Sequence, residues 1–370
     1  MKNKFLPALA VLVGTAIGAG YLGIPYVVSK SGFIPGLACL ILVGIFMITI
    51  YLYLGEISLR TKGTHQLTGY AQRYLGKSGK MLMFLSMIFG IFSALSAYLL
   101  AQGESLSYVF FGVESFGLLC SIGFWILMAG LTYIGLSALK KIEKFVVFFV
   151  FLVLILIVVV FSGKINLDNL TYINPKNFFV PFGLIFFSFL AFSAMPEVER
   201  ILHGQERLMK KVVFFGMLIP FTVYLLFMIV LLGNFGINVP EIATLALGRF
   251  FSVLGILTMF TAYFASTIAI RDMFRFDFNL GRIKGWLLAV FVPLILFLLI
   301  YFYKLASFVQ ILSVSGIVSG GLAGILILLM NRKAKTMGNR KPEYSIKINW
   351  WIIGILSFIF IAAVVAEFVL

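Results

Sequence analysis

Long apolar runs separated by short polar segments follow one another along almost the whole chain. A helix needs about 20 mostly apolar residues to cross a lipid bilayer. Eleven runs reach this length, at residues 5–28, 35–59, 80–111, 117–138, 144–162, 178–199, 211–233, 249–273, 285–303, 305–330 and 348–369. The pattern therefore predicts an all-α polytopic membrane protein with eleven transmembrane helices.

The composition agrees with this class of protein. Of the 370 residues, 62% are hydrophobic and 11% are charged, whereas soluble domains average about 25% charged residues. Cys39 and Cys120 lie within or beside apolar runs, and two such cysteines suit neither a disulfide framework nor a metal site. The apolar runs hold no pair of aspartates, no metal-ligand cluster and no Ser/His pair. We therefore expect neither enzymatic activity nor a cofactor.

The basic residues are distributed unevenly between the two sides of the predicted bundle. Of the 29 Lys and Arg residues, 24 fall on one side; the other side holds five, Lys30, Lys164, Lys176, Arg249 and Lys304. Because Lys and Arg accumulate in cytoplasmic loops, the N-terminus is predicted to be cytoplasmic and the C-terminus outside. Membrane topology thus explains the net charge of +16, and no nucleic-acid partner is expected.

The first and sixth apolar runs each contain residues that interrupt a helix. Gly14, Gly18 and Gly20 lie within seven residues of the first run, and each costs about 1 kcal/mol in a helix relative to alanine. The GxxxG spacing of the first two also suits close packing of two helices, so the glycines alone leave both interpretations open. In the sixth run, Pro196 removes a backbone donor close to the polar Ser193. Paired interruptions five spans apart favour a binding site at the middle of the membrane.

Interrupted helices indicate the chemistry of a ligand. They expose backbone N–H and C=O groups at membrane depth, where protein, water, ions or a ligand must satisfy them. The positive N-terminal end of a half-helix favours a carboxylate, and free carbonyls favour an ammonium group or Na⁺. A zwitterionic amino acid carries both groups, so the two interruptions favour an amino acid over a sugar.

At this point the sequence resembles a known family. The run Gly14–Tyr26, GTAIGAGYLGIPY, is similar to the first span of the amino acid/auxin permease family. The segments Ser29–Phe33, Gly69–Tyr70 and Ala101–Gly103 look like the same family. Bacterial aromatic amino acid permeases are an alternative family with the same fold.

The resemblance implies the LeuT-type fold of the amino acid–polyamine–organocation superfamily. In that fold two inverted repeats of five helices, here residues 1–162 and 178–330, form a single transporter domain, and residues 348–369 would be one extra span. The resemblance also implies substrate contacts by position. The amides of Ala19 and Gly20 would hold the substrate carboxylate. The ammonium group would be held by carbonyls near Phe189, Ala191 and Phe192, together with the Ser193 hydroxyl. The expected substrate-binding residues are Thr15, Ala16, Gly18, Ala19, Gly20, Phe189, Ala191, Phe192 and Ser193.

Sodium-coupled relatives of this fold bind Na⁺ between the first and eighth spans. The corresponding candidates here are the carbonyls of Gly14 and Ile17, with Ala262, Ser266 and Thr267 opposite them. The resemblance does not complete this site, because Ala265 stands where a second hydroxyl is often found.

A coupling proton would instead need an ionisable residue at membrane depth, where such residues are costly and usually functional. Glu104 in the third span and Glu197 in the sixth are the candidates, and the choice between H⁺ and Na⁺ remains open. Glu56 lies near the end of the second span and is expected to reach water or a basic loop.

These expectations combine into a secondary active transporter of amino acids that works by alternating access, as a symporter coupled to H⁺ or Na⁺. An amino-acid sensor in the membrane is one alternative, and an uncoupled exchanger or facilitator of the same fold is another. We expect a multi-pass protein of the cell membrane, in contact with lipid and with an amino acid as its small-molecule substrate.

Overall fold

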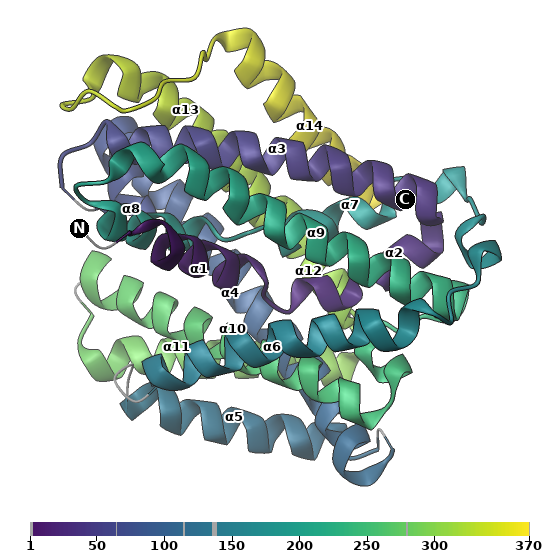
Figure 1. Cartoon of the computed structure of the whole chain (residues 1–370). Coiled ribbons are helices and arrows are strands. Elements are labelled where there is room, and N and C mark those ends of the chain that lie inside the picture. Colours follow the sequence, from purple (N-terminus) through teal and green to yellow (C-terminus); the bar gives the residue numbers. More distant parts are fainter. Residues whose placement is uncertain (1–2, 64, 114, 135–138, 279, 370) are drawn as a thin grey trace.

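The computed structural model describes residues 3–63, 65–113, 115–134, 139–278 and 280–369. Within these residues the protein is all-helical and forms no strand, apart from an isolated bridge between Gly32 and Ile173. Most helices run roughly parallel to one another across Figure 1. The sequence prediction of an all-α polytopic membrane protein is therefore confirmed.

The helices follow the predicted apolar runs closely. Their bounds are α1 Phe5–Ala16, α2 Ile24–Ser31, α3 Phe33–Leu59, α4 Leu67–Phe111, α5 Gly117–Ile134, α6 Leu139–Ser162, α7 Val180–Ser188, α8 Met195–Leu202, α9 Met209–Phe235, α10 Arg249–Asp277, α11 Arg282–Tyr303, α12 Phe308–Ser315, α13 Gly321–Met337 and α14 Trp350–Val369. Short 3₁₀ turns include η1 Gly20–Gly23, η4 Phe192–Ala194, η6 Gly236–Asn238 and η7 Ala243–Leu247. A π-helical turn at Gly316–Gly320 joins α12 to α13.

The number of membrane-spanning segments differs from the prediction of eleven. In the described residues, eight segments are long and apolar enough to span, and the bent pair α1 and η1–α2, which meet at 46°, makes a ninth. Helices α6 and α14 occupy two further predicted runs. Their apolar described parts, Val150–Ser162 and Trp350–Ala362, are too short to count in the same way. The structure thus supports eight or nine spans rather than eleven.

The two interrupted spans lie side by side and run in opposite directions. Helix α1 packs against α8, and α2 packs against α7, so the first half of each span meets the second half of the other. In Figure 1, α1 and α8 lie toward the left and α2 and α7 toward the right. Helix α4 packs against α5, α10, α11 and α13. This arrangement brings both interruptions to the interior of the bundle, beside α4 and α10.

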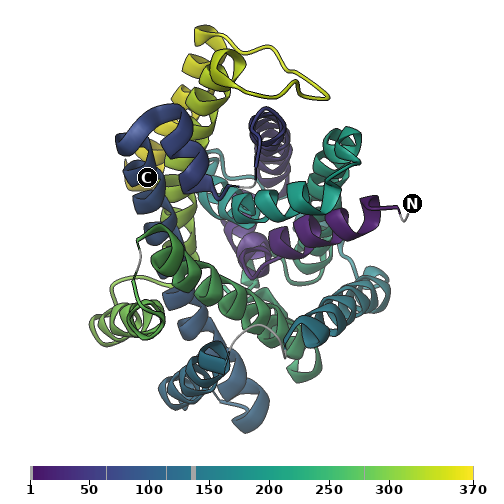
Figure 2. The same ribbon diagram turned by 90° about the vertical axis from the view of Figure 1, so that its left-hand side faces the viewer.

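One end of the bundle, which we call the basic end, gathers the N-terminus and the loops rich in Lys and Arg. The Lys4 amide donates to Gln205 at 3.2 Å, and the Arg340 guanidinium donates to the carbonyl of Leu59 at 2.8 Å. Figure 2 views the bundle from this side. At the opposite end, Asn174 donates from its amide to the carbonyl of Ser31 at 2.8 Å. The ends thus match the predicted division of the loops into two sets.

Glu56 is the centre of a polar cluster at the basic end. Its side chain is fully buried, and its carboxylate lies 2.8 Å from Arg60 Nε and 2.9 Å from Lys335 Nζ. It also accepts hydrogen bonds from Ser345 Oγ at 2.9 Å and from the Ile346 amide at 3.0 Å. Of the two expected surroundings of Glu56, water or a basic loop, the structure shows the second, because the carboxylate is buried and pairs with basic residues. Glu56 fastens the segment between α13 and α14 to α3.

Candidate functional site

The first interruption lies between α1 and η1, within the predicted glycine series. Helix α1 ends at Ala16, and Ile17 leaves the helical region with φ −79° and ψ 68°. After the break, Leu22 donates from its amide to the carbonyl of Ala19 at 3.2 Å. The amides of Gly20 and Tyr21 therefore stand at the start of the half-helix η1–α2, where helix N–H groups have no intrahelical acceptor.

The second interruption lies between α7 and η4. Helix α7 ends at Ser188, and Ala191 lies outside the helical region with φ −133° and ψ 29°. Pro196 falls in the first turn of α8, where a missing N–H costs no hydrogen bond. The break therefore precedes the proline instead of being centred on it, and Phe192 and Ser193 begin the second half-helix.

Two tyrosines from other spans satisfy backbone groups at the breaks. The Tyr51 hydroxyl donates to the carbonyl of Phe189 at 2.9 Å and accepts a hydrogen bond from the amide of Ala191. The Tyr224 hydroxyl lies 2.7 Å from the carbonyls of Ala16 and Ser188, and so joins the two broken spans. These contacts matter because unsatisfied backbone groups are costly at membrane depth.

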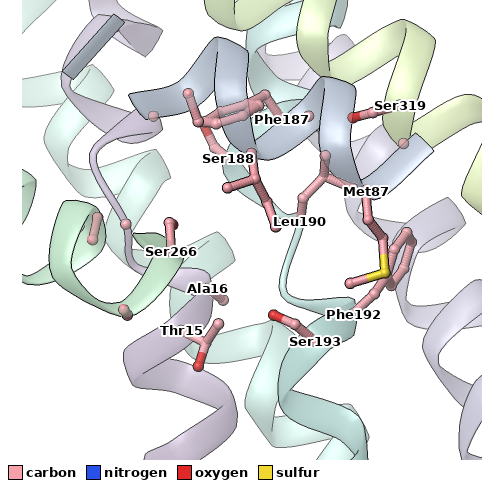
Figure 3. A pocket seen from close by; sticks show the side chains of 18 of the residues that line it. Thr15, Ala16, Met87, Phe187, Ser188, Leu190, Phe192, Ser193, Ser266 and Ser319 are labelled. Atoms are coloured by element: carbon pink, nitrogen blue, oxygen red, sulfur yellow. The ribbon is translucent and has the colours of Figure 1, made fainter. Parts of the chain in front are cut away.

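Between the breaks lies a cavity of about 210 Å³. It is bordered by both interruptions, by α4 and α10, and by the π-helical turn (Figure 3). In the described part of the chain its lining holds no charged side chain. Figure 3 shows Ser193 pointing toward Thr15 and Ala16, and Leu190 reaching into the middle of the cavity. The cavity thus combines backbone ends of half-helices with neutral side chains.

Most of the predicted substrate-binding residues border this cavity. Those that line it are Thr15, Ala16, Gly18, Gly20, Phe192 and Ser193. Ala19, Phe189 and Ala191 are buried behind the lining. The Phe189 carbonyl, which we expected to hold the ammonium group, is already bound by Tyr51.

The glycines of the first span have different surroundings. A Cβ atom added at Gly18 would meet nothing closer than 3.9 Å. A Cβ atom at Gly20 would lie 2.7 Å from Ser188 Oγ and 2.9 Å from a ring carbon of Phe187. Gly20 therefore allows η1 to pack closely against α7, whereas Gly18 borders open space. The close-packing interpretation, which was made for the GxxxG pair, therefore does not apply at Gly18 and applies instead at Gly20.

The candidates for ion coupling divide between the cavity and other places. Gly14, Ile17, Ala262 and Ser266 line the cavity, whereas Thr267 is buried and donates its hydroxyl to the carbonyl of Tyr263 at 2.8 Å.

The two candidate carboxylates for a proton lie elsewhere. Glu104 is part of α4 but does not line the cavity. The Glu197 side chain is 49% exposed and pairs with Arg200 at 3.0 Å, outside the cavity lining.

Sequence reasoning did not find the cavity residues of α4 and of the π-helical turn. Ser86 donates its hydroxyl to the carbonyl of Ser319 at 2.6 Å, and Ser319 donates to Ser315 at 2.6 Å. Met87 and Tyr98 also line the cavity from α4. The only sign of this turn in the sequence was a run of small and polar residues at 313–320, SVSGIVSG. Such π-helical turns often occur at functional sites.

Comparison with known proteins identifies the family. The sequence profile of the tryptophan/tyrosine permease family matches residues 1–246. Tyrosine-specific transport system 1 of Haemophilus influenzae is 25% identical over 81% of this chain and 81% of its own length. Glutamine transporter 2 of Aliivibrio fischeri is 20% identical over 64% of this chain, and the chain spans 63% of that relative.

A further relative, tyrosine-specific transport system 2 of Haemophilus influenzae, is 24% identical over 61% of this chain and 57% of its own length. The profile match overturns the resemblance to the amino acid/auxin permeases, which rested mainly on one glycine-rich span. Such a span is shared by more than one family with interrupted helices, and so it was not specific enough. The chain belongs to the tryptophan/tyrosine permease family.

Proposed function

We propose that the protein is a secondary active transporter of amino acids that binds its substrate between the two interrupted spans and works by alternating access. One observation carries the proposal: the ends of four half-helices border a cavity whose described lining has no charged side chain. The relatives named as tyrosine-specific transport systems and as a glutamine transporter support an amino acid as the substrate.

The substrate carboxylate would bind at the start of η1. The amide end of a half-helix carries a partial positive charge of roughly half a unit, and the amides of Ala19 and Gly20 lie there. Gly20 lines the cavity, whereas the backbone of Ala19 is hydrogen-bonded to the Tyr98 hydroxyl. Gly20 would therefore contact the carboxylate directly, and Ala19 would contribute through Tyr98 and the local dipole.

The substrate ammonium group would bind on the other side of the cavity. Ser193 lines the cavity at the start of the second half-helix, and its hydroxyl points toward Thr15 and Ala16 at the carbonyl end of α1 (Figure 3). The negative end of α1 favours a cation. Because Tyr51 occupies the Phe189 carbonyl, Ser193 and the last turn of α1 are the better partners.

The substrate side chain would be neutral. Met87, Phe187, Leu190 and Phe192 provide apolar surface around the cavity. A charged side chain buried there without a partner would cost several kcal/mol. Side chains such as those of tyrosine, tryptophan or glutamine would avoid this cost.

The positions of the interruptions support a LeuT-type architecture. Inverted repeats place equivalent broken helices in antiparallel pairs around a central site, and the two interrupted spans here have that relation. The repeats would comprise residues 1–162 and 178–330, with α6 completing the first repeat and α14 serving as the extra span at 348–369. Counting α6 and α14 together with the nine apolar segments would give eleven spans. The excess of basic loops at one end would then place the N-terminus in the cytoplasm and the C-terminus outside the cell membrane.

The conformation corresponds to an inward-facing state in this proposal. Thr15 and Ser193, on the basic side of the breaks, are exposed, whereas Gly20, Tyr21 and Gly23 are buried on the other side. A Cβ atom at Gly23 would lie 2.8 Å from Leu184 and 2.9 Å from Val309, so the opposite side is tightly packed. Transport would require this packing to open while the basic side closes.

The coupling ion would be Na⁺ or H⁺. The sodium candidates Gly14, Ile17 and Ser266 border the cavity next to the proposed substrate site. The proton candidates Glu104 and Glu197 do not line it, so a proton would act at a distance from the substrate.

Uptake into proteoliposomes tests the proposed function. The panel would comprise L-tyrosine, L-tryptophan, L-glutamine, L-lysine and L-glutamate, each under an imposed sodium gradient, an imposed proton gradient and neither. We expect uptake of at least one neutral amino acid and none of lysine or glutamate. Accumulation under one gradient alone would identify the coupling ion, and exchange without either gradient would indicate an uncoupled exchanger. Absence of uptake and exchange for all five would refute the proposal.

A further inference from the structure

A second cavity, of about 270 Å³, lies near the opposite end of the bundle. Its walls come from α2, the start of α7, the loop between η6 and η7, and α12. It shares no described lining residue with the central cavity. Gly23, the last residue of η1, packs closely against Leu184 of α7 and Val309 of α12, two of the helices that form the walls of this cavity.

A cation and an anion line this outer cavity without neutralising each other. The Lys30 ammonium lies over the Tyr26 ring, 4.6 Å from its centroid. The Glu241 carboxylate accepts hydrogen bonds from the Val309 amide at 3.3 Å and from the Tyr26 hydroxyl. Among the ion pairs in the described part of the chain, none involves Lys30 or Glu241. Their charges remain available to a ligand.

The rest of the outer cavity suits the remainder of a neutral amino acid. Val27, Phe179, Val180 and Val309 supply apolar wall. Ser307 and Gln310 line it as well, but they hydrogen-bond each other's backbone amides in a capping box at the start of α12. The described lining thus combines apolar side chains with two opposite charges, and it contains no third charged side chain.

We propose that the outer cavity is a second amino-acid site, in which Lys30 binds the carboxylate and Glu241 binds the ammonium group of a zwitterionic substrate. The proposal rests on the proposed transport function, because it supplies the central site with substrate from the opposite side. Lys30 is exposed and Glu241 is partly exposed. Because water screens such charges, we expect the outer site to bind weakly. Glu241 also fastens the η6–η7 loop to α12, and an ammonium group would compete for that carboxylate.

Equilibrium dialysis of the full-length protein in detergent, with L-tyrosine and separately with L-glutamine, tests the outer site by counting bound equivalents. We expect two for the wild type, one tight and one weak. Lys30→Met and Glu241→Gln should each weaken the second site roughly tenfold, since each removes a charge-assisted hydrogen bond. Lys304→Met is the matched control, because Lys304 lies at the same end but outside the cavity, and it should bind as the wild type does.

Ligands that lack one charged group assign the two residues separately. Tyramine has no carboxylate, so its weak binding should respond to Glu241→Gln and not to Lys30→Met. The carboxylate 3-(4-hydroxyphenyl)propionate should show the reverse response. This pattern would not arise from a general loss of folding, which would alter both ligands together.

Different results would overturn the outer site and the transport function. A single bound equivalent or none for both amino acids, or unchanged affinities in Lys30→Met and Glu241→Gln, would overturn the outer site. Uptake by the same protein would then still support the central site. Absence of uptake across the amino-acid panel would instead overturn the transport function.

Discussion

Replacing Tyr51 with phenylalanine removes one oxygen atom that serves both sides of the break in the sixth span. The ring would keep its place against Phe192, at a centroid distance of 5.0 Å. The carbonyl of Phe189 and the amide of Ala191 would each lose their partner. A buried polar group left unsatisfied costs about 1–3 kcal/mol, so the two together would cost about 2–6 kcal/mol.

The substitution would therefore destabilise the backbone conformation at the break, which the proposed substrate site requires. Where the competing arrangement becomes favoured by about 2 kcal/mol, only about one molecule in 30 keeps the intact break, and the substrate binds roughly 30-fold more weakly. We therefore expect Tyr51→Phe to lower both the thermal unfolding temperature in detergent and the affinity for the substrate.

Tyr53→Phe provides the matched control for this experiment. Tyr53 lies two residues away on the same helix, is also buried, and donates its hydroxyl to the carbonyl of Lys347 at 2.9 Å, far from the cavity. Its loss should cost about 1 kcal/mol and leave the affinity unchanged. If Tyr51→Phe were no more destabilising than Tyr53→Phe and bound substrate equally well, the reasoning about the break would be refuted.

Three further substitutions test other parts of the account. Glu56→Gln should destabilise the protein by about 2 kcal/mol. Breaking a fully buried ion pair costs about 3–5 kcal/mol, but the basic partners of Glu56 keep some contact with water. Thermal unfolding would show the loss, with Glu197→Gln, at an exposed position, as a near-neutral control. Ser266→Ala should reduce stimulation of uptake by a sodium gradient roughly tenfold, whereas Thr267→Ala should not, and equal stimulation in both would reject the sodium candidate. Gly20→Ala should cost about 1–3 kcal/mol of stability through overpacking against α7, and wild-type unfolding would contradict that close contact.

The interruptions of the first and sixth spans could be predicted because residues that disfavour a helix interior lie close to both breaks. Gly14, Gly18 and Gly20 together weaken a helix. Pro196 lacks the backbone N–H that a helix interior needs and clashes with the carbonyl four residues earlier. The structure moves the second break a few residues toward Ala191, since a proline fits the first turn of a helix. The local sequence was therefore sufficient to predict the approximate position of both breaks.

The groups that complete the site could not be predicted in the same way. Tyr51 and Tyr224 reach the breaks from α3 and α9, and their spacing along the chain carries no sign of these partners. The burial of Glu56 likewise depends on Lys335, which lies 279 residues away in sequence. Contacts of this kind follow from how the helices pack, whereas helix breaks follow from the residues themselves.

Substrate binding to Gly18→Val tests directly whether the substrate site lies between the two interrupted spans. The new side chain would enter the central cavity, because an added Cβ atom at Gly18 has no neighbour closer than 3.9 Å. Gly123→Val is the matched control, since its Cβ atom would meet no described atom within 4 Å and Gly123 does not line the cavity. We expect Gly18→Val to fold with wild-type thermal stability and to lose tight binding, whereas Gly123→Val should keep tight binding. Tight binding by a folded Gly18→Val would contradict a substrate site between the two interrupted spans.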